Sequence, residues 1–336
     1  MSFAPLLMAA VLASPSASHP TPDLDVVSRQ VQTQAQARTQ TEPGDSPVQL
    51  EDIEVRGRQL QDLVRDFVNE VAEPNAYRGL ARWDSQICVG VANLKGEAAQ
   101  YLADRISTIA EDLDLRPGAP GCTPNLLIVA TSDGNGMAET LVGERRRAFR
   151  MGGAGMDRGG AALQDFVETD RAVRWWQMSL PVDSNTGAPA VRISGECRND
   201  CKSVNDIAPQ IKLDSASRLR TQIVDRIIRT IVIVDVDQVS QLSINQLADY
   251  IAMVSLAQIN PESDTSGYAS ILNVFDQPDY TDRLTDWDQA YLGGLYNAER
   301  NRLNRRANRS EISDSIMRAH AQVTAGRDDE QNAVQD

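Results

Sequence analysis

The chain has 336 residues, 41% of them hydrophobic, which is enough apolar material for one large core or two smaller ones. Its 33 basic and 47 acidic residues give a net charge of -14, and that charge repels nucleic acid and anionic lipid wherever no local basic patch overrides it. We therefore expect no nucleic-acid partner.

Residues 1–18 have the pattern of a secretory signal peptide. An apolar run from Phe3 to Ala13 is followed by small residues that end at Ser18. Cleavage can follow Ala13, Ala17 or Ser18, and the alternative reading is an apolar but disordered terminus. No other apolar run reaches the roughly 18 residues that a membrane span needs. The pattern predicts an exported protein, periplasmic or secreted, without a membrane span.

Residues 19–50 read as a disordered linker, because Gln, Thr, Pro and Ser dominate and few large apolar side chains are present. A first strand is expected within residues 49–60, leading into a helix over residues 59–72. The apolar residues of that helix recur at helical spacing and predict one face buried on a core. They are Leu60, Leu63, Val64, Phe67, Val68 and Val71.

Four cysteines fit the oxidising compartment that export implies. Cys88 begins one expected strand and Cys122 comes just before the next, so a parallel arrangement of these strands would bring the two thiols together. Cys197 and Cys201 are close enough in sequence to pair with each other. A metal site of four thiolates is the alternative, but it needs two close cysteine pairs and the chain has one. We expect two disulfides.

Residues 86–133 predict a strand, a helix and a second strand, which is the pattern of a right-handed βαβ unit. A helix is expected next over residues 137–149, followed by a flexible loop over residues 151–160. Two further strands are expected over residues 172–183 and 189–195. This succession indicates a sheet covered by helices.

An amphipathic helix is expected over residues 215–229. The unbroken Val and Ile run within residues 229–237 then predicts a strand buried on both faces. A largely interior helix follows this strand. Ser243 and Gln246 have the spacing of a capping box, which predicts that the interior helix begins near Ile244.

The stretch QLADYIAMVSLAQI, residues 246–259, and the later phrases YASILN and LTDWDQAYLGGLY resemble the active-site region of zincin metalloproteases, particularly the metzincin type. In that family a central helix after a sheet strand carries the motif HExxHxxGxxH, and a Met-turn and a closing segment follow. Other residues fill the matching positions here: Ala248 and Ala252 at the helical histidines, Asp249 at the catalytic glutamate, Ser255 at the glycine, Gln258 at the third histidine and Leu272 at the methionine. The closing segment is matched at Leu284, Asp288, Leu295 and Tyr296.

The resemblance implies an α+β fold in which a zincin-like mixed sheet packs against the helix of residues 246–259. It assigns this domain to residues 51–296. Residues 297–336 then form a C-terminal tail that is expected to be helical at first and disordered beyond.

Zinc protease chemistry needs two imidazoles one helical turn apart, a third ligand and a carboxylate that takes a proton from the bound water. Alanine has no lone pair, and the two histidines of the chain, His19 and His320, lie outside the motif. The same count excludes Ser-His-Asp and Cys-His nucleophile systems. We therefore expect a catalytically inactive pseudopeptidase without metal or cofactor, which binds a peptide or an envelope protein in the inherited cleft.

Two other functions remain open. One is a hydrolase with a carboxylate-based site at Asp249, Asp235 or Asp237. The last two form a DxD at the end of the buried strand, where carboxylates can hold a divalent ion, although such residues more often end a strand in solvent. The other is a purely structural component of the envelope.

Residues 132–139 have some likeness to a dinucleotide-binding loop, but the third glycine is replaced by Glu139. Ser132 or Asp133 as the N-cap of the next helix accounts for this stretch better.

Trp175 and Trp176 would point to opposite faces of a strand, so one could be exposed as a platform for a sugar or a peptide, although a structural pair is favoured. The basic run over residues 297–309 is predicted to be helical. It could dock on an acidic partner or a membrane surface, while an ordinary solvated helix is the simpler reading.

Overall fold

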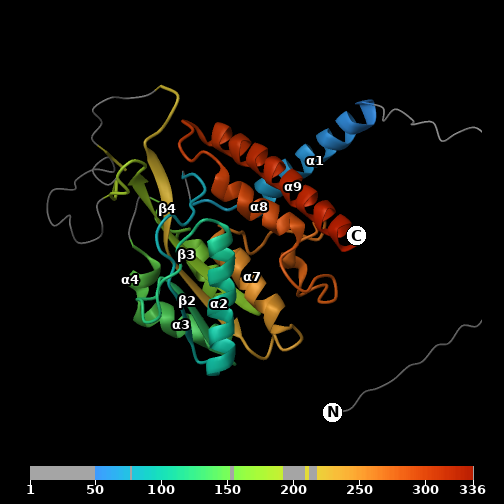
Figure 1. The fold of residues 1–336 in the computed structure, drawn as a ribbon. Helices are drawn as coiled ribbons and strands as arrows, with labels where there is room; N and C mark the ends of the chain where they lie inside the picture. Colours follow the sequence, from blue (N-terminus) through green and yellow to red (C-terminus); the bar gives the residue numbers. More distant parts are fainter. Residues whose placement is uncertain (1–49, 76–77, 152–154, 192–208, 212–217, 336) are drawn as a thin grey trace, which may run out of the picture. The chain divides into compact units, whose positions relative to one another are not determined.

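A four-stranded mixed sheet lies at the centre of the computed structural model (Figure 1). Its strands are β1 (Val89–Ala92), β2 (Leu126–Thr131), β3 (Val173–Asp183) and β4 (Ile223–Asp235), in the order β1-β2-β4-β3. Strands β1, β2 and β4 run parallel to one another, and the edge strand β3 pairs antiparallel with β4. The prediction of a mixed α and β fold is confirmed.

The structure describes residues 50–75, 78–151, 155–191, 209–211 and 218–335, without the side chains of residues 50–58 and 328–335. The predicted signal peptide, the linker and the Cys197–Cys201 disulfide lie outside these residues. So does the strand expected over residues 189–195, from Arg192 onward. Within the described part, no helix is both long and apolar enough to cross a membrane.

Eight α-helices and one 3-10 turn are found in the described part. They are α1 (Leu50–Val71), α2 (Gly96–Asp112), α3 (Gly134–Glu144), α4 (Arg146–Phe149), α5 (Gly160–Glu168), α7 (Ile244–Leu256), η1 (Ile271–Asn273), α8 (Asp286–Asn297) and α9 (Arg305–Gln335).

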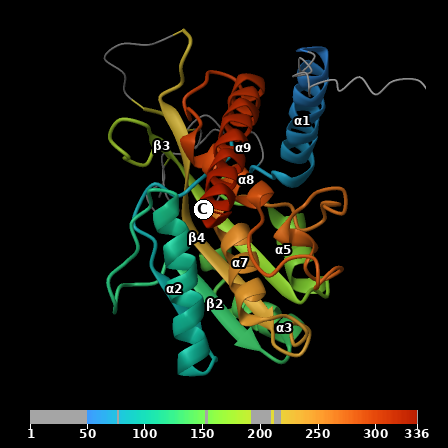
Figure 2. The same cartoon turned by 45° about the vertical axis from the view of Figure 1, so that its right-hand side comes forward.

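Both faces of the sheet are covered, because alternate residues of β3 and β4 point to opposite sides. Trp175 and Val232 belong to the larger apolar core, which they share with α1, α2, α7, α8 and α9. Trp176 and Ile231 belong to a second core with α3, α4 and α5. Figure 2 shows α2 and α7 in front of the strands in that view. Both tryptophans are buried, so they are the structural pair that the sequence favours.

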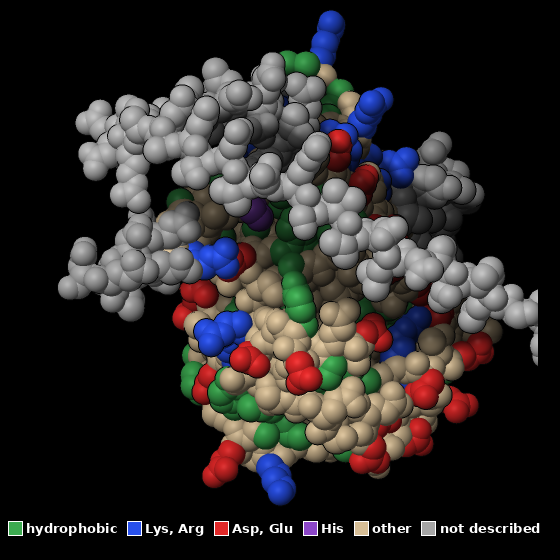
Figure 3. Space-filling model, turned by 90° about the vertical axis from the view of Figure 1, so that its right-hand side faces the viewer, with side chains coloured by type: hydrophobic (Ala, Val, Ile, Leu, Met, Phe, Trp, Pro, Cys, Tyr) green, Lys and Arg blue, Asp and Glu red, His purple; other side chains and the backbone are tan. Residues whose placement is uncertain are grey.

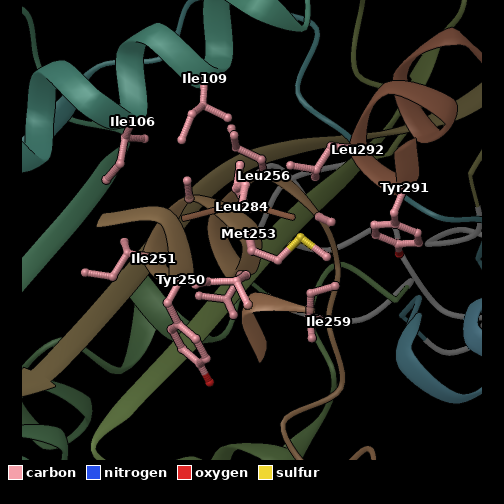
Figure 4. Close-up of a cluster of buried hydrophobic side chains, with 14 of the residues drawn as sticks. Ile106, Ile109, Tyr250, Ile251, Met253, Leu256, Ile259, Leu284, Tyr291 and Leu292 are labelled. Atoms are coloured by element: carbon pink, nitrogen blue, oxygen red, sulfur yellow. The ribbon is translucent and has the colours of Figure 1, made fainter. Parts of the chain in front are cut away.

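The interior helix begins where its capping box predicts. In α7 the Ser243 hydroxyl accepts from the Gln246 amide, and the Gln246 side chain accepts from the Ser243 amide. Every residue from Gln246 to Leu256 is buried. Figure 4 shows Met253 and Leu256 of this helix among side chains of α2 and α8. The helix ends at Leu256, three residues before the end that the sequence suggests.

Two predicted elements are wrong. A helix was expected over residues 215–229, but β4 already begins at Ile223. Leu219, Ile223 and Ile227 fit a helical spacing. The segment nevertheless forms a strand, because it is rich in β-branched residues and pairs with β3 at eleven positions. The strand expected within residues 49–60 is also absent, because α1 already starts at Leu50. Its Glu, Arg, Gln and Leu residues favour a helix.

Three more differences concern helix boundaries. The loop expected over residues 151–160 ends at Gly160, where α5 begins. The helix expected over residues 137–149 is divided into α3 and α4. The basic run over residues 297–309 is not one helix, because residues 298–304 connect α8 to α9 without helical structure.

The chain continues in ordered contact beyond Tyr296. α9 packs along α8 and also touches α1 (Figure 1). Its apolar side chains Ile312, Ile316 and Ala319 are buried in this contact. The helical part of the expected C-terminal segment is therefore an integral layer of the fold.

The expected disulfide between Cys88 and Cys122 is confirmed. It joins the start of the β1 segment to the loop that leads into β2, two places that the parallel pairing of these strands brings close together. No described cysteine is free.

Candidate functional site

The positions that match the zincin motif lie in the core. Ala248, Asp249, Ala252 and Ser255 are all fully buried within α7. Gln258 lies beyond the end of the helix and is also buried; its side-chain oxygen accepts from the Ala81 amide at 2.7 Å. Leu272 is partly buried in η1 and packs against the same core. Buried side chains of this kind offer a ligand no accessible polar atom.

Asp249, which the sequence resemblance aligns with the catalytic glutamate of zincins, is fully buried and hydrogen-bonded through both carboxylate oxygens. Both of its oxygens pair with the Arg105 guanidinium of α2, at 2.6 and 2.8 Å, and one also accepts from the Leu284 amide at 2.7 Å. The hydrogen bonds that Arg105 donates to Asp249 raise the pKa of Arg105 above its usual value. The carboxylate thus ties α2 and the segment before α8 to α7.

Asp288 anchors the 3-10 turn η1, the segment whose sequence resembles a Met-turn. It accepts from the Ser270 hydroxyl at 2.6 Å, the Ile271 amide at 2.8 Å and the Thr285 amide at 2.9 Å. Burial raises the pKa of Asp288, and these hydrogen bonds oppose that rise. The turn is therefore fixed to the start of α8.

The two aspartates of the DxD at the end of β4 differ in burial. Asp235 is buried and accepts from the Gly134 and Asp237 amides, both at 3.1 Å. Asp237 is exposed. Asp133 caps α3 by accepting from the Gly136 amide at 2.8 Å, as the N-cap interpretation predicts. In the described part of the chain, no group of three or more His, Cys, Asp or Glu side chains is placed to hold a metal ion.

A large groove lies elsewhere, between α1 and the first turns of α9. Its volume is about 950 Å³, and we call it the arginine groove because five arginines line it. They are Arg65, Arg78, Arg305, Arg306 and Arg309. Asp314 is the one acidic residue among the described residues that line it.

Helical spacing builds the two walls of the arginine groove. Along α1, the lining residues Gln61, Arg65 and Asn69 recur every four positions and share one face. Along α9, Arg305, Arg309 and Ser313 recur in the same way. The Arg309 guanidinium donates to the Asn69 side-chain oxygen at 3.0 Å and joins the two walls.

The arginines of the groove differ in how far they are neutralised. Arg78 forms a tight pair with Asp225, with nitrogen to oxygen distances of 2.8 and 2.6 Å. Arg65 pairs with Asp62 at the surface. The exposed side chains of Arg305 and Arg306 make no hydrogen bond or ion pair with any described residue. Two positive charges therefore remain open to a ligand.

A neighbouring set of arginines has a structural role. Asp84 pairs with both Arg226 of β4 and Arg300 of the connector between α8 and α9. Arg82 donates to the carbonyl oxygens of Leu295 and Ala298 at the end of α8. The pKa of Arg82 is lowered to about 10, mainly by burial and to a smaller extent by repulsion from Arg300. These contacts hold the connector against the sheet and so fix where α9 begins.

The sequence showed one wall of the groove and missed the other. The basic run over residues 297–309 supplies Arg305, Arg306 and Arg309. Arg65 and Arg78 come from a distant part of the chain. The polar row of α1 at every fourth position was visible in the sequence, but only the packing of α1 beside α9 places it opposite the basic run.

The chain matches no protein-family model, no curated protein and no solved structure.

Proposed function

We propose that this is a non-catalytic binding protein of the cell envelope, with a zincin-like layout that has lost its metal ligands. Two features support the layout: α7 follows directly after the parallel strand β4, and η1 packs against α7. The absence of catalysis is argued from the residues that stand at the motif positions. Ala248 and Ala252 have no donor atom, and Asp249 is enclosed by Arg105 and Leu284.

Binding is assigned to the arginine groove and not to the inherited cleft. The side chains at the motif positions are core groups, whereas Arg305 and Arg306 are exposed in a groove of about 950 Å³. Ligand sites are concave and bring a few polar groups together at one place. The groove meets both conditions.

An oxidising compartment suits this proposal. The Cys88–Cys122 disulfide is of a kind that persists in secreted and periplasmic proteins and is rare in the reducing cytosol. The partner is then an envelope protein or a peptide present in the same compartment.

The test is metal analysis of the purified protein, combined with a general peptidase assay with and without EDTA. We expect no stoichiometric zinc, and no peptide turnover with or without EDTA. Stoichiometric zinc together with EDTA-sensitive peptide cleavage would refute the proposal.

A further inference from the structure

We infer that the arginine groove binds an extended, acidic segment of a polypeptide; this rests on the proposed binding function. The charge of the groove is the first reason. Five arginines and one aspartate line it, although the chain as a whole carries a net charge of -14. Acidic side chains are spread over the lower part of the face in Figure 3, so the groove differs in sign from that surface.

Arginine also defines the chemical class of the ligand. The planar guanidinium makes paired, charge-assisted hydrogen bonds with carboxylates. Arg305 and Arg306 have this capacity unused, since no described residue pairs with either side chain. The N-terminal end of α9, where both residues lie, adds a partial positive charge from the helix dipole.

The length of the walls defines the size of the segment. Gln61 and Asn69 are eight residues apart along α1, which corresponds to about 12 Å at 1.5 Å per residue. An extended peptide rises about 3.3 Å per residue, so about four residues fit along the groove.

Polar groups without charge complete the site. The side chains of Gln61 and Ser310 both line the groove and make no hydrogen bond with any described residue. An amide and a hydroxyl can bond to the backbone of an extended peptide, whose own amide and carbonyl groups are unpaired. The combination of arginines with neutral polar groups therefore suits a peptide.

A flat bilayer surface fits the groove less well. The floor residue Arg78 keeps only 12% of its side-chain surface exposed, between the walls formed by α1 and α9. A narrow chain can reach this recess, whereas lipid headgroups in a plane would touch only the rim. The polypeptide is therefore the favoured occupant.

The experiment is fluorescence anisotropy of a labelled peptide with four consecutive glutamates between Gly-Ser flanks, titrated with the full chain. We expect saturable binding that weakens as salt rises, because exposed charges are screened. Replacing both Arg305→Gln and Arg306→Gln should weaken binding by about tenfold or more, as the loss of charge-assisted hydrogen bonds implies.

The matched control is the double variant Arg146→Gln and Arg147→Gln. These arginines are also exposed, adjacent and helical, but they lie in α4, outside the arginine groove. The control removes the same charge and should change the affinity by less than about twofold, because it removes no direct contact. Circular dichroism of both double variants checks that the fold is kept.

Several outcomes would overturn the inference. They are no binding of the glutamate peptide, equal weakening by both double variants, or equal binding of a four-lysine peptide. Retention on phosphatidylglycerol vesicles without peptide binding would also overturn it and point to a lipid surface. None of these results involves zinc or turnover, so they are distinguishable from a failure of the proposed function.

Discussion

At the scale of single residues, two of the three aspartates named as catalytic candidates are bonded within the fold. Asp249 and Asp235 are buried and accept hydrogen bonds from neighbouring elements, whereas Asp237 is exposed. A sequence shows that a carboxylate is present, but its partners come from segments far away along the chain. Arg105 lies 144 positions before Asp249. For this reason the sequence could name Asp249 as a candidate and could not assign its role.

The replacement Asp249→Asn tests this role. It removes the charge that faces Arg105 and one acceptor, so we expect the free energy of unfolding to fall by about 2–3 kcal/mol. Arg105 is 31% exposed and can be rehydrated in part, which keeps the loss below that of a fully buried pair. Urea unfolding measures the change. The control is Asp237→Asn at the exposed Asp237, which should change the free energy of unfolding by less than about 0.5 kcal/mol. An equal loss of stability in both variants would contradict the structural role of Asp249.

Asp165 gives a prediction for the dependence of stability on pH. Burial raises its pKa, but hydrogen bonds from Arg171 and Thr169 outweigh burial and hold the pKa below the usual 3.8. A folded pKa below the unfolded one means that the stabilisation is present above about pH 3.8 and is lost as pH falls through the folded pKa. The stability difference between the wild type and Asp165→Asn should therefore shrink between pH 6 and pH 2. A difference that grows on acidification would contradict this sign.

At the scale of elements, helix and strand patterns that were short or overlapping led to the errors. β4 carries apolar residues at helical spacing in its first half, and only its pairing with β3 decides its structure. By contrast, α2 and β2 carry one clear pattern each and were predicted correctly. In α9 the apolar residues Ile312, Ile316 and Ala319 recur at helical spacing, but this pattern does not show that their face packs on α8. The close approach of the two helices at one glycine is also not visible in the sequence.

That glycine is Gly294. A Cβ placed there would lie 2.6 Å from the Ile316 backbone nitrogen of α9, whereas one on Gly293 would meet nothing closer than 3.8 Å. We expect Gly294→Ala to lower the free energy of unfolding by about 1–3 kcal/mol through overpacking. Gly293→Ala should be neutral or stabilising by up to about 1 kcal/mol, because alanine favours a helix. Thermal denaturation of the pair measures both, and equal melting temperatures would contradict the close approach.

At the scale of the whole folded unit, one network links the core to the arginine groove. Arg226 of β4 pairs with Asp84, and Asp84 also pairs with Arg300 of the connector of residues 298–304. The connector leads into α9 beside α1. The sequence indicated the mixed fold, the Cys88–Cys122 disulfide and the interior helix. It could not indicate the groove, since the two walls are separated by more than two hundred residues.

Hydrogen exchange measured by mass spectrometry, with and without the glutamate peptide, tests the location of binding most directly. We predict slower exchange on binding in residues 61–69 of α1 and 304–314 around the start of α9, with residues 246–259 and 268–273 unchanged. Protection confined to residues 246–259 and 268–273 would contradict the account, because it would place binding at the region whose sequence resembles the zincin motif.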